Sequence, residues 1–504
     1  MKNAFGFLIL IVGLMVSAAG AQITYPNPIN HVIVIDQENR TTDNLFGSNS
    51  PKNQYYLPGL VFATSGKGWT LSGGKRTTIT VESVALPLAS TVGSKGSIPA
   101  DDYDPNHSHS LWVTACDAPV KTDPSNLCVM DGFNHVSVTC DKGVTGCPGP
   151  KYPPYAYVQY SDVAPYFQIA AQYGYANYMF QTNQGPSYPS HLFTFGGTSQ
   201  PGLGPEPTWF VAENDEGTVG NYGCAANVGT LVQLVNPATQ DEKTAIFPCF
   251  NHSTLADVFA GASPQITWTY YTSGPNSLQT TPNSFEALCT VVKGACTGSY
   301  WTKGAANGYV NLTPSNILTD ISNCKLQQVN WVIPVGLESD HAGLTDGSGP
   351  SWVASIINAI GTQPKCSNGE TYWDNTVILV TWDDWGGWYD HVVPPAPPAK
   401  APAEAASYVY GFRVPLLVVS AYTPAGTVSN TMGLDFGAML KFIEEIFNVG
   451  TIPPGDYADY YANDDLGEFF QFSKPPRRFQ SVAAPLVKEV FLDPKRPVTD
   501  ADND

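Results

Sequence analysis

Carboxylate and amide side chains follow two short apolar runs of this sequence. The run at residues 32–35 leads into Glu38 and Asn39, and the run at residues 377–380 leads into Asp383 and Asp384. Adjacent carboxylates repel each other unless positive charge lies between them, and a hard divalent cation held by carboxylate and amide oxygens removes that repulsion. A solvated acidic turn is the alternative interpretation. The apolar Trp-Gly-Gly-Trp segment at 385–388 argues against such a turn. We therefore predict a metal site formed by Glu38, Asn39, Asp383 and Asp384.

Histidine is scarce, with eight residues in the chain, so the placement of each one carries weight. His341 follows Asp340 within ten residues of a third apolar run at 329–333, and His391 follows the aspartate pair. His107 lies in the sequence Asp-Pro-Asn-His. A single histidine is more often structural, but several that converge with carboxylates suit the binding of an anionic group and the protonation of a leaving oxygen.

Ser187 is the candidate nucleophile. It lies between two prolines and behind Gly185, in a segment that predicts a tight, rigid turn. The sequence around it lacks the G-x-S-x-G pattern, which removes the main support for an α/β-hydrolase. An ordinary turn serine is the alternative.

These residues need a sheet to bring them together, and the apolar runs supply it. The runs at 32–35, 329–333, 377–380 and 416–419 have the continuous apolar character of buried parallel strands. Amphipathic helices are predicted between and after them, at 353–360 with a stop at Gly361 and at 436–447 behind Asp435 as N-cap. Because side chains at the carboxyl ends of parallel strands share one edge, an α/β fold would gather the candidate residues there.

The composition excludes several classes of protein. The chain has 504 residues, 24 Lys and Arg against 43 Asp and Glu, and a formal net charge of −19. A nucleic-acid partner is not expected, because nucleic-acid binding needs a basic surface, and the acidity also discourages adhesion to anionic membranes. Hydrophobic residues make up 43%, which rules out a disordered chain, and the 46 glycines and 42 prolines predict many turns and loops.

The first 21 residues are typical of a signal peptide. Lys2 precedes an apolar run at 5–16, and Ala19-Gly20-Ala21 provides an A-x-A cleavage site. An uncleaved anchor is the alternative, and no later segment is apolar and long enough for a transmembrane helix. We expect a secreted or periplasmic protein.

Ten cysteines fit an oxidising compartment, and none forms a C-x-x-C motif. The close pairs suggest small stapled loops, although the sequence leaves the connectivity open and buried free thiols are the alternative. These pairs are Cys116/Cys128, Cys140/Cys147 and Cys289/Cys296.

We predict a single catalytic domain over residues 22–492. Residues 51–151 are rich in Gly, Pro, Ser and Asp and are expected to form loops and a lid rather than sheet. Residues 200–250 and 273–325 are expected to be further insertions, and they carry five of the ten cysteines. The polar tail at 493–504 is expected to fray.

Seven segments together resemble the bacterial phosphoesterase family that includes phospholipases C and related acid phosphatases. The agreement covers nearly the whole mature chain and keeps the same order, which makes coincidence improbable. The segments are HVIVIDQENRTTDNLFG (31–47), DPNH (104–107), VMDGF (129–133), GPSYPSHLFTFGGTS (185–199), ESDHAG (338–343), WDDWGGWYDHVVPP (382–395) and YGFRVPLLVVS (410–420).

The resemblance implies an alkaline-phosphatase-like α/β fold, mostly parallel, with helices on both faces and long loop insertions. It implies a metal-dependent phosphoric ester hydrolase in which Ser187 attacks phosphorus, forms a phosphoseryl intermediate and also contacts the metal. Histidine would protonate the leaving group. The implied roles are metal ligation by Glu38, Asn39, Ser187, Asp383 and Asp384, catalysis by Ser187, His107, His341 and His391, and substrate binding at Asp340, Ser190 and His191.

Two departures from the family pattern bear on the substrate. The family has Asn after the proline that follows the nucleophile, where this chain has Ser190, and it has Asp-Glu where this chain has Asp383 and Asp384. The family's longer phospholipases carry further C-terminal domains. These points favour phosphomonoesters as in the acid phosphatases, with a phospholipase C acting on phospholipid head groups as the alternative.

A sulfatase and a non-catalytic protein are two rival interpretations. A sulfatase would have Arg at the position where this chain has His191, which argues against the sulfatase interpretation. A non-catalytic exported binding protein on a hydrolase scaffold would be expected to lose ligand or nucleophile positions, and here all are filled by chemically competent residues.

Overall fold

The computed structural model describes residues 23–88, 103–119, 127–140, 150–202, 204, 206, 208–212, 222–302, 308–398, 401 and 409–501. The predicted signal peptide therefore lies outside the described residues. None of the helices in these ranges combines the length and the apolar character that crossing a lipid bilayer requires.

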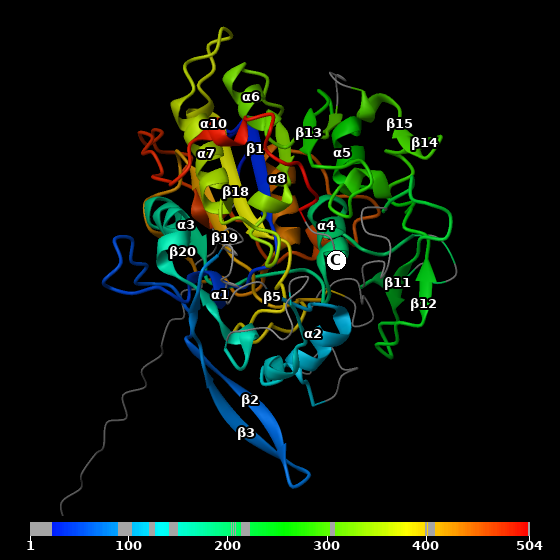
Figure 1. Ribbon diagram of the computed structural model, residues 1–504. Helices are drawn as coiled ribbons and strands as arrows, with labels where there is room; N and C mark the ends of the chain where they lie inside the picture. Colours follow the sequence, from blue (N-terminus) through cyan, green and yellow to red (C-terminus); the bar gives the residue numbers. More distant parts are fainter. Residues whose placement is uncertain are drawn as a thin grey trace, which may run out of the picture.

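The core is an eight-stranded sheet within the described residues (Figure 1). Seven strands run in one direction, and only β19 is antiparallel to its neighbours. This confirms the predicted α/β class with a mostly parallel sheet. In spatial order the strands are β16 (Gly308–Asn311), β13 (Trp268–Tyr271), β17 (Val329–Val332), β1 (His31–Gln37), β18 (Thr376–Trp382), β19 (Leu416–Ser420), β8 (Gly174–Ala176) and β20 (Thr427–Ser429).

The centre of the sheet is formed by the apolar runs that the sequence identified. Every residue of β1, β17, β18 and β19 is buried, as expected for strands covered on both faces. β1 pairs in parallel with β18, with Gln37 opposite Trp382. The two strands therefore end at the same level, and the residues that follow them emerge side by side.

Helices cover both faces of the sheet. Asp36 and Trp382 occupy positions of opposite parity in the β1–β18 register, so their side chains point to opposite faces. The Asp36 face carries α4 (Ser187–Gly196), which packs against α8 (Phe436–Ile446). The Trp382 face carries α3 (Tyr160–Gln172), which packs against α7 (Gly349–Thr362).

The predicted helices are confirmed with small changes at their ends. The Asp435 side chain accepts a hydrogen bond from the Ala438 N–H and so caps α8 as expected. α7 ends at Thr362, one residue beyond the predicted stop at Gly361. The remaining helices with four or more residues are α1 (Thr42–Phe46), α2 (His109–Cys116), α5 (Leu255–Gly261), α6 (Asn316–Ser322), α9 (Ala458–Tyr461) and α10 (Lys488–Phe491).

The expectation of loops without sheet at 51–151 is wrong. β2 (Ser65–Ser72) and β3 (Lys75–Glu82) form an antiparallel hairpin that projects from the core (Figure 1). Gly73 and Gly74 form its turn, both with positive φ, as a two-residue hairpin turn requires. Other small sheets are formed by β4 (Ala85–Leu86) with β7 (Tyr157–Val158), β5 (Tyr103–Pro105) with β6 (Val138–Cys140), β9 (Met179–Phe180) with β21 (Leu434–Asp435), β14 (Thr290–Val292) with β15 (Ala295–Thr297), and β10 (Phe210–Val211), β11 (Val232–Val235) and β12 (Thr244–Ile246).

The polar C-terminal tail is packed onto the fold in its described part, so the expectation of fraying is wrong there. The Gly336 N–H donates to the Thr499 carbonyl, and the Ser339 hydroxyl donates to the Ala501 carbonyl. Ala501 is fully buried. Because these contacts fall on the segment before Asp340, the tail supports a loop that leads into the candidate site.

Disulfides confirm two of the predicted cysteine pairs, Cys116–Cys128 and Cys289–Cys296. Two longer links, Cys224–Cys249 and Cys324–Cys366, were not predicted. The predicted partner of Cys140, Cys147, lies outside the described residues.

Candidate active site

Residues from the ends of β1 and β18 form the base of the candidate site. Glu38 and Asn39 follow β1, Asp383 and Asp384 follow β18, and all four side chains are fully buried. The Asn39 N–H donates to Asp383 Oδ1 at 2.9 Å, and the Gly386 N–H donates to Asp384 Oδ1 at 2.6 Å. The convergence that the sequence predicted is therefore present.

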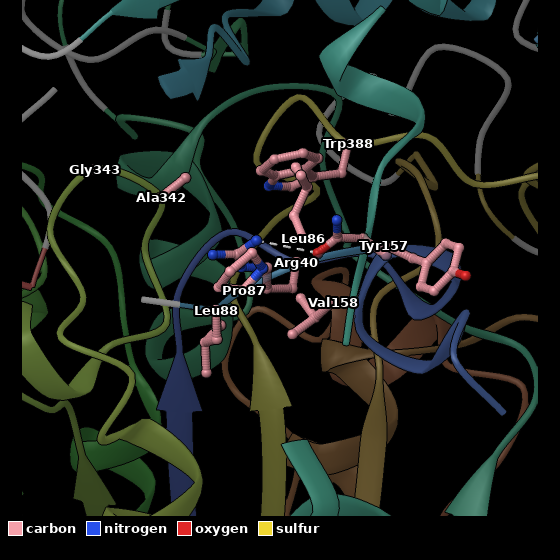
Figure 2. A pocket seen from close by; sticks show the side chains of 10 residues that line it. Arg40, Leu86, Pro87, Leu88, Tyr157, Val158, Ala342, Gly343 and Trp388 are labelled. Carbon is pink, nitrogen blue, oxygen red and sulfur yellow. Dashed lines mark hydrogen bonds between the residues drawn. The ribbon is translucent and has the colours of Figure 1, made fainter. Parts of the chain in front are cut away.

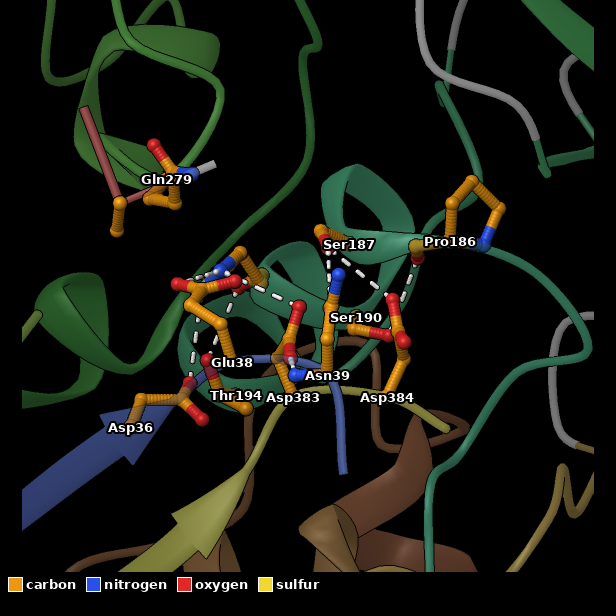
Figure 3. Close-up of polar contacts among 12 residues, drawn as sticks. Asp36, Glu38, Asn39, Pro186, Ser187, Ser190, Thr194, Gln279, Asp383 and Asp384 are labelled. Atoms are coloured by element: carbon orange, nitrogen blue, oxygen red, sulfur yellow. Dashed lines mark hydrogen bonds and ion pairs between the residues drawn. The ribbon is translucent and has the colours of Figure 1, made fainter. Parts of the chain in front are cut away.

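Ser187 approaches this base from the first residue of α4 (Figure 3). Its Oγ lies 3.1 Å from Asp384 Oδ2 and 3.3 Å from Asn39 Oδ1, within hydrogen-bond reach of both. Pro186 occupies the N-cap position, and no side chain caps the helix. Backbone N–H groups at such an end favour an anion near the hydroxyl.

Gln181 holds the turn before Ser187 in place. Its amide NH2 donates to the Gly185 carbonyl, and its Oε1 accepts a hydrogen bond from the Trp385 N–H. The turn that carries Ser187 is thereby joined to the turn that carries Asp383 and Asp384. The prediction of a rigidly held serine agrees with this arrangement.

The buried carboxylates provide a test of whether a cation fits here. Asp383 Oδ2 is buried and makes no hydrogen bond to any described residue, although its other oxygen is satisfied by Asn39. A buried carboxylate oxygen left in this state is costly unless positive charge reaches it. Glu38 Oε1, Asp383 Oδ2 and a ring nitrogen of His191 lie within 4.8 Å of one another, close enough for one ion to contact all three. The residues present therefore fit a divalent metal.

His191, which the sequence predicted to bind substrate, is instead buried among the carboxylates of the site. Its ring is fully buried, with Nε2 3.3 Å from Glu38 Oε1 and 3.7 Å from Asp383 Oδ2. Its Nδ1 lies 3.4 Å from Asp36 Oδ2. Burial lowers the pKa of His191, but the charge of Glu38 and the contact with Asp36 outweigh it and raise the pKa well above its usual value. Burial raises the pKa of Asp36.

His107 and His341 lie together at the edge of the site. His107 Nε2 is 3.3 Å from Asn39 Nδ2 and 4.0 Å from Asp384 Oδ2, so it faces two of the candidate metal ligands. The His341 ring meets the His107 ring edge-on, with ring centres 6.2 Å apart. Two predicted histidines are thus placed where they could contact a phosphate ester next to Ser187.

Asp340 supports the His341 loop from the opposite face of the sheet. Its Oδ2 accepts hydrogen bonds from the Tyr166 hydroxyl at 2.6 Å and from Trp382 Nε1 at 3.2 Å. Burial raises the pKa of Asp340 to about 6. These contacts indicate that Asp340 positions the loop.

Ser190 makes its hydrogen bonds behind the nucleophile turn. Its hydroxyl donates to Asn183 Oδ1 and to the Pro186 carbonyl, at 3.1 and 3.2 Å. These contacts stabilise the first turn of α4. They do not direct the hydroxyl toward the metal-site residues.

His391 belongs to a separate buried ionic network. Its Nδ1 lies 2.7 Å from Asp43 Oδ2, and Arg413 bonds both Asp43 and Asp390. Asp43, Asp390 and His391 could also be grouped as metal donors, but the fully buried Arg413 already supplies positive charge there. His391 therefore connects the loop that follows β18 to the segment that follows β1.

A small pocket lies beside the His341 loop (Figure 2). Arg40 lines it, donating to the Asp340 carbonyl and to Asn44 Oδ1. The Arg40 guanidinium also lies over the Trp388 ring at 5.1 Å. Arg40 follows Asn39 directly, so this cation is held next to the turn that carries two candidate ligands.

Sequence reasoning missed Asp36 and the placement of His191, although both had a signal. Asp36 is two residues before Glu38, and side chains two apart on a strand share one face. His191 is four residues after Ser187, one turn along the same helix face.

Fold and site together define an α/β protein with a carboxylate-rich candidate metal centre and a serine at a helix N-terminus facing it. The chain belongs to the Phosphoesterase family, whose family model matches residues 29–450. Phospholipase C B of Mycobacterium tuberculosis (strain CDC 1551 / Oshkosh) is 28% identical over 179 residues, which are 32% of this chain and 33% of that protein. Hemolytic phospholipase C of Pseudomonas aeruginosa is 21% identical over 436 residues, 84% of this chain and 53% of that protein.

The aligned regions thus span between about a third and about half of the length of these relatives. Among solved structures, a protein in the alkaline phosphatase superfamily from Vibrio parahaemolyticus matches 64% of this chain and 66% of its own. The sequence identity is 10% and the TM-score is 0.31.

Proposed function

We propose that this protein is an exported, metal-dependent phosphoester hydrolase with Ser187 as nucleophile. The observation that carries the proposal is the position of Ser187 Oγ, at the N-terminus of α4 and within 3.3 Å of oxygens from Asn39 and Asp384. A hydroxyl held against the carboxyl edge of the sheet, facing buried carboxylates, is suited to in-line attack on a phosphate ester.

The residues of the site would have separate roles in binding the metal, attacking phosphorus and donating a proton. Glu38, Asn39, Ser187, Asp383 and Asp384 would hold a divalent ion, which would lower the pKa of the serine hydroxyl and screen the phosphate oxygens. Ser187 Oγ would bond to phosphorus as the bond to the leaving oxygen breaks, giving a phosphoseryl group. His107 or His341 would donate a proton to the leaving alkoxide, and water would then release phosphate from Ser187.

Phosphomonoesters are the proposed substrates. Asp384 is shorter than the glutamate of the family pattern given with the resemblance, and Ser190 bonds within its own turn instead of offering an amide. A phospholipase C acting on phosphodiesters is the second candidate, and it is favoured by the names of the relatives, which are phospholipases C.

The deciding experiment compares hydrolysis of p-nitrophenyl phosphate and p-nitrophenyl phosphorylcholine by the purified mature protein, across added divalent metals. Faster release from the monoester supports the proposal. Preference for the choline diester favours the phospholipase candidate. A metal-bound protein that turns over neither substrate, and behaves like Ser187→Ala, would point to the non-catalytic binding protein.

A further inference from the structure

The His191 ring lies between three buried carboxylates, but its contacts with them are longer than charge-assisted hydrogen bonds. Its nitrogens are 3.3 to 3.7 Å from Asp36, Glu38 and Asp383, and neither nitrogen makes a hydrogen bond to a described residue. Charge-assisted hydrogen bonds are typically about 2.7–2.9 Å long. Ion pairing alone therefore leaves the spacing of these groups unexplained.

The spacing agrees with that of ligands around one ion. Two ligand atoms that each lie about 2.1 Å from a metal ion are roughly 3.0–3.7 Å apart for ligand angles between about 90° and 125°. His191 Nε2 is 3.3 Å from Glu38 Oε1 and 3.7 Å from Asp383 Oδ2, and the three atoms lie within 4.8 Å of one another. Nε2 thus faces the two carboxylates that the proposed function already assigns to the metal.

The surroundings of Asp36 provide a second, independent observation. Its side chain is fully buried, and neither of its carboxylate oxygens makes a hydrogen bond to a described residue. Its Oδ2 faces Nδ1, the other ring nitrogen of His191 (Figure 3 shows Asp36 and Glu38 on the same side of the site). Metal-bound histidines commonly donate their second ring N–H to a carboxylate, which fixes the orientation of the ring.

We propose that His191 binds the metal ion through Nε2 and that Asp36 orients its ring from Nδ1. The inference rests on the proposed metal-dependent function and adds one nitrogen donor to the oxygen donors of Glu38, Asn39, Ser187, Asp383 and Asp384. Because imidazole favours transition metals, the mixed set selects ions such as Zn²⁺, Mn²⁺ or Fe²⁺ over Ca²⁺ and Mg²⁺. Asp36 is then a positioning residue that acts through His191.

X-ray absorption spectroscopy of the zinc-loaded full-length mature protein tests this directly. Scattering from the outer atoms of a bound imidazole distinguishes a histidine ligand from an all-oxygen site. We expect this signature in the wild type, its loss in His191→Gln, and its retention in His107→Gln, the matched control whose ring also faces the site. Asp36→Asn should retain bound zinc but weaken its affinity about 10- to 100-fold in competition with a chelating dye.

The outcomes separate this inference from the proposed function. Zinc bound by the wild type without imidazole scattering overturns the histidine ligand and leaves the metal-dependent function standing. Persistence of the signature in His191→Gln also overturns it. A wild-type protein that takes up no ion overturns the metal-dependent function, and this inference with it. If His191→Gln fails to fold, which circular dichroism would reveal, the wild type and His107→Gln still test the inference: absence of the imidazole signature from the wild type, or its loss in His107→Gln, overturns it.

Discussion

The backbone N–H of Asn39 donates a hydrogen bond to Asp383 Oδ1 at 2.9 Å, joining the turn after β1 to the turn after β18. Asn39 adopts a positive φ of 61°, which turns its N–H toward the neighbouring strand. One carboxylate oxygen of Asp383 thus fixes the backbone and leaves the other oxygen for the proposed ion. The candidate metal site and the pairing of two central strands are therefore structurally coupled.

Replacement of Asp383 and Asp384 by asparagine should remove the metal. The side-chain amide oxygen introduced by Asp383→Asn could still accept the Asn39 N–H, so the turn should persist while two negative charges are lost. We expect bound metal, measured by elemental analysis, to fall to background with a near-native circular dichroism spectrum. Unchanged metal content would refute this site.

Ser187→Ala should lower hydrolysis by roughly 10³-fold or more, because the attacking oxygen is removed. The fold and the bound metal should be retained, since the remaining proposed ligands are intact. Activity is measured on p-nitrophenyl phosphate with a metal-replete sample, whose loading is checked by elemental analysis. Full activity in that sample would contradict the nucleophile assignment.

Gly386→Ala should destabilise the protein and disturb the Asn39 turn. Gly386 has a φ of +56°, and an added Cβ would lie 2.3 Å from the Asn39 carbonyl oxygen. We expect a loss of more than about 2 kcal/mol in the free energy of unfolding, measured by urea denaturation, together with weaker metal binding.

Gly73→Ala is the matched control for that substitution. Gly73 has a φ of +57°, but an added Cβ would meet nothing within 4 Å. It should therefore show only the backbone cost of a left-handed alanine, about 1 kcal/mol, with normal metal binding. Equal effects of the two substitutions would show that the close approach to Asn39 is unimportant.

His391 should make stability depend on pH above about 6.5. Burial lowers its pKa, but the hydrogen bond and charge of Asp43 outweigh burial and raise the pKa above 6.5. The folded state therefore holds the proton more tightly than the unfolded state. This contribution is complete below pH 6.5 and is lost as the pH rises through the raised pKa.

His391→Gln should accordingly cost about 1–3 kcal/mol at pH 6, and the difference from the wild type should shrink at alkaline pH. Urea denaturation of both proteins over a pH series measures that difference. Burial raises the pKa of Asp390 to about 6 and the charge of His391 opposes that rise, so the measured difference includes the effect of His391 on Asp390. A difference that does not change with pH would contradict the proposed charge on His391.

Much of the fold and the base of the site could be predicted because both depend on local patterns. Strands buried on both faces are continuous apolar runs, and the residues after β1 and β18 must emerge together once those strands pair. Glu38, Asn39, Asp383 and Asp384 follow from that rule alone. The Ser187 turn was visible from its prolines and glycine.

The remaining features depend on contacts between distant segments. His391 follows the aspartate pair in sequence, yet its ring turns to Asp43, a partner that sequence spacing does not reveal. The C-terminal tail is polar, but its backbone carbonyls accept hydrogen bonds from Gly336 and Ser339. The β2–β3 hairpin is largely exposed, so it lacks the apolar run that identified the core strands.

The place of β1 in the sheet also sets the order in which the molecule can be assembled. β1 is among the first described segments of the chain, but its two neighbours begin at Val329 and Thr376. During synthesis this apolar strand must wait for nearly three hundred further residues before either partner exists. Such pairing between distant segments has high contact order, which slows folding and exposes the strand to aggregation. The candidate metal site, built on the ends of β1 and β18, would therefore be among the last parts of the protein to form.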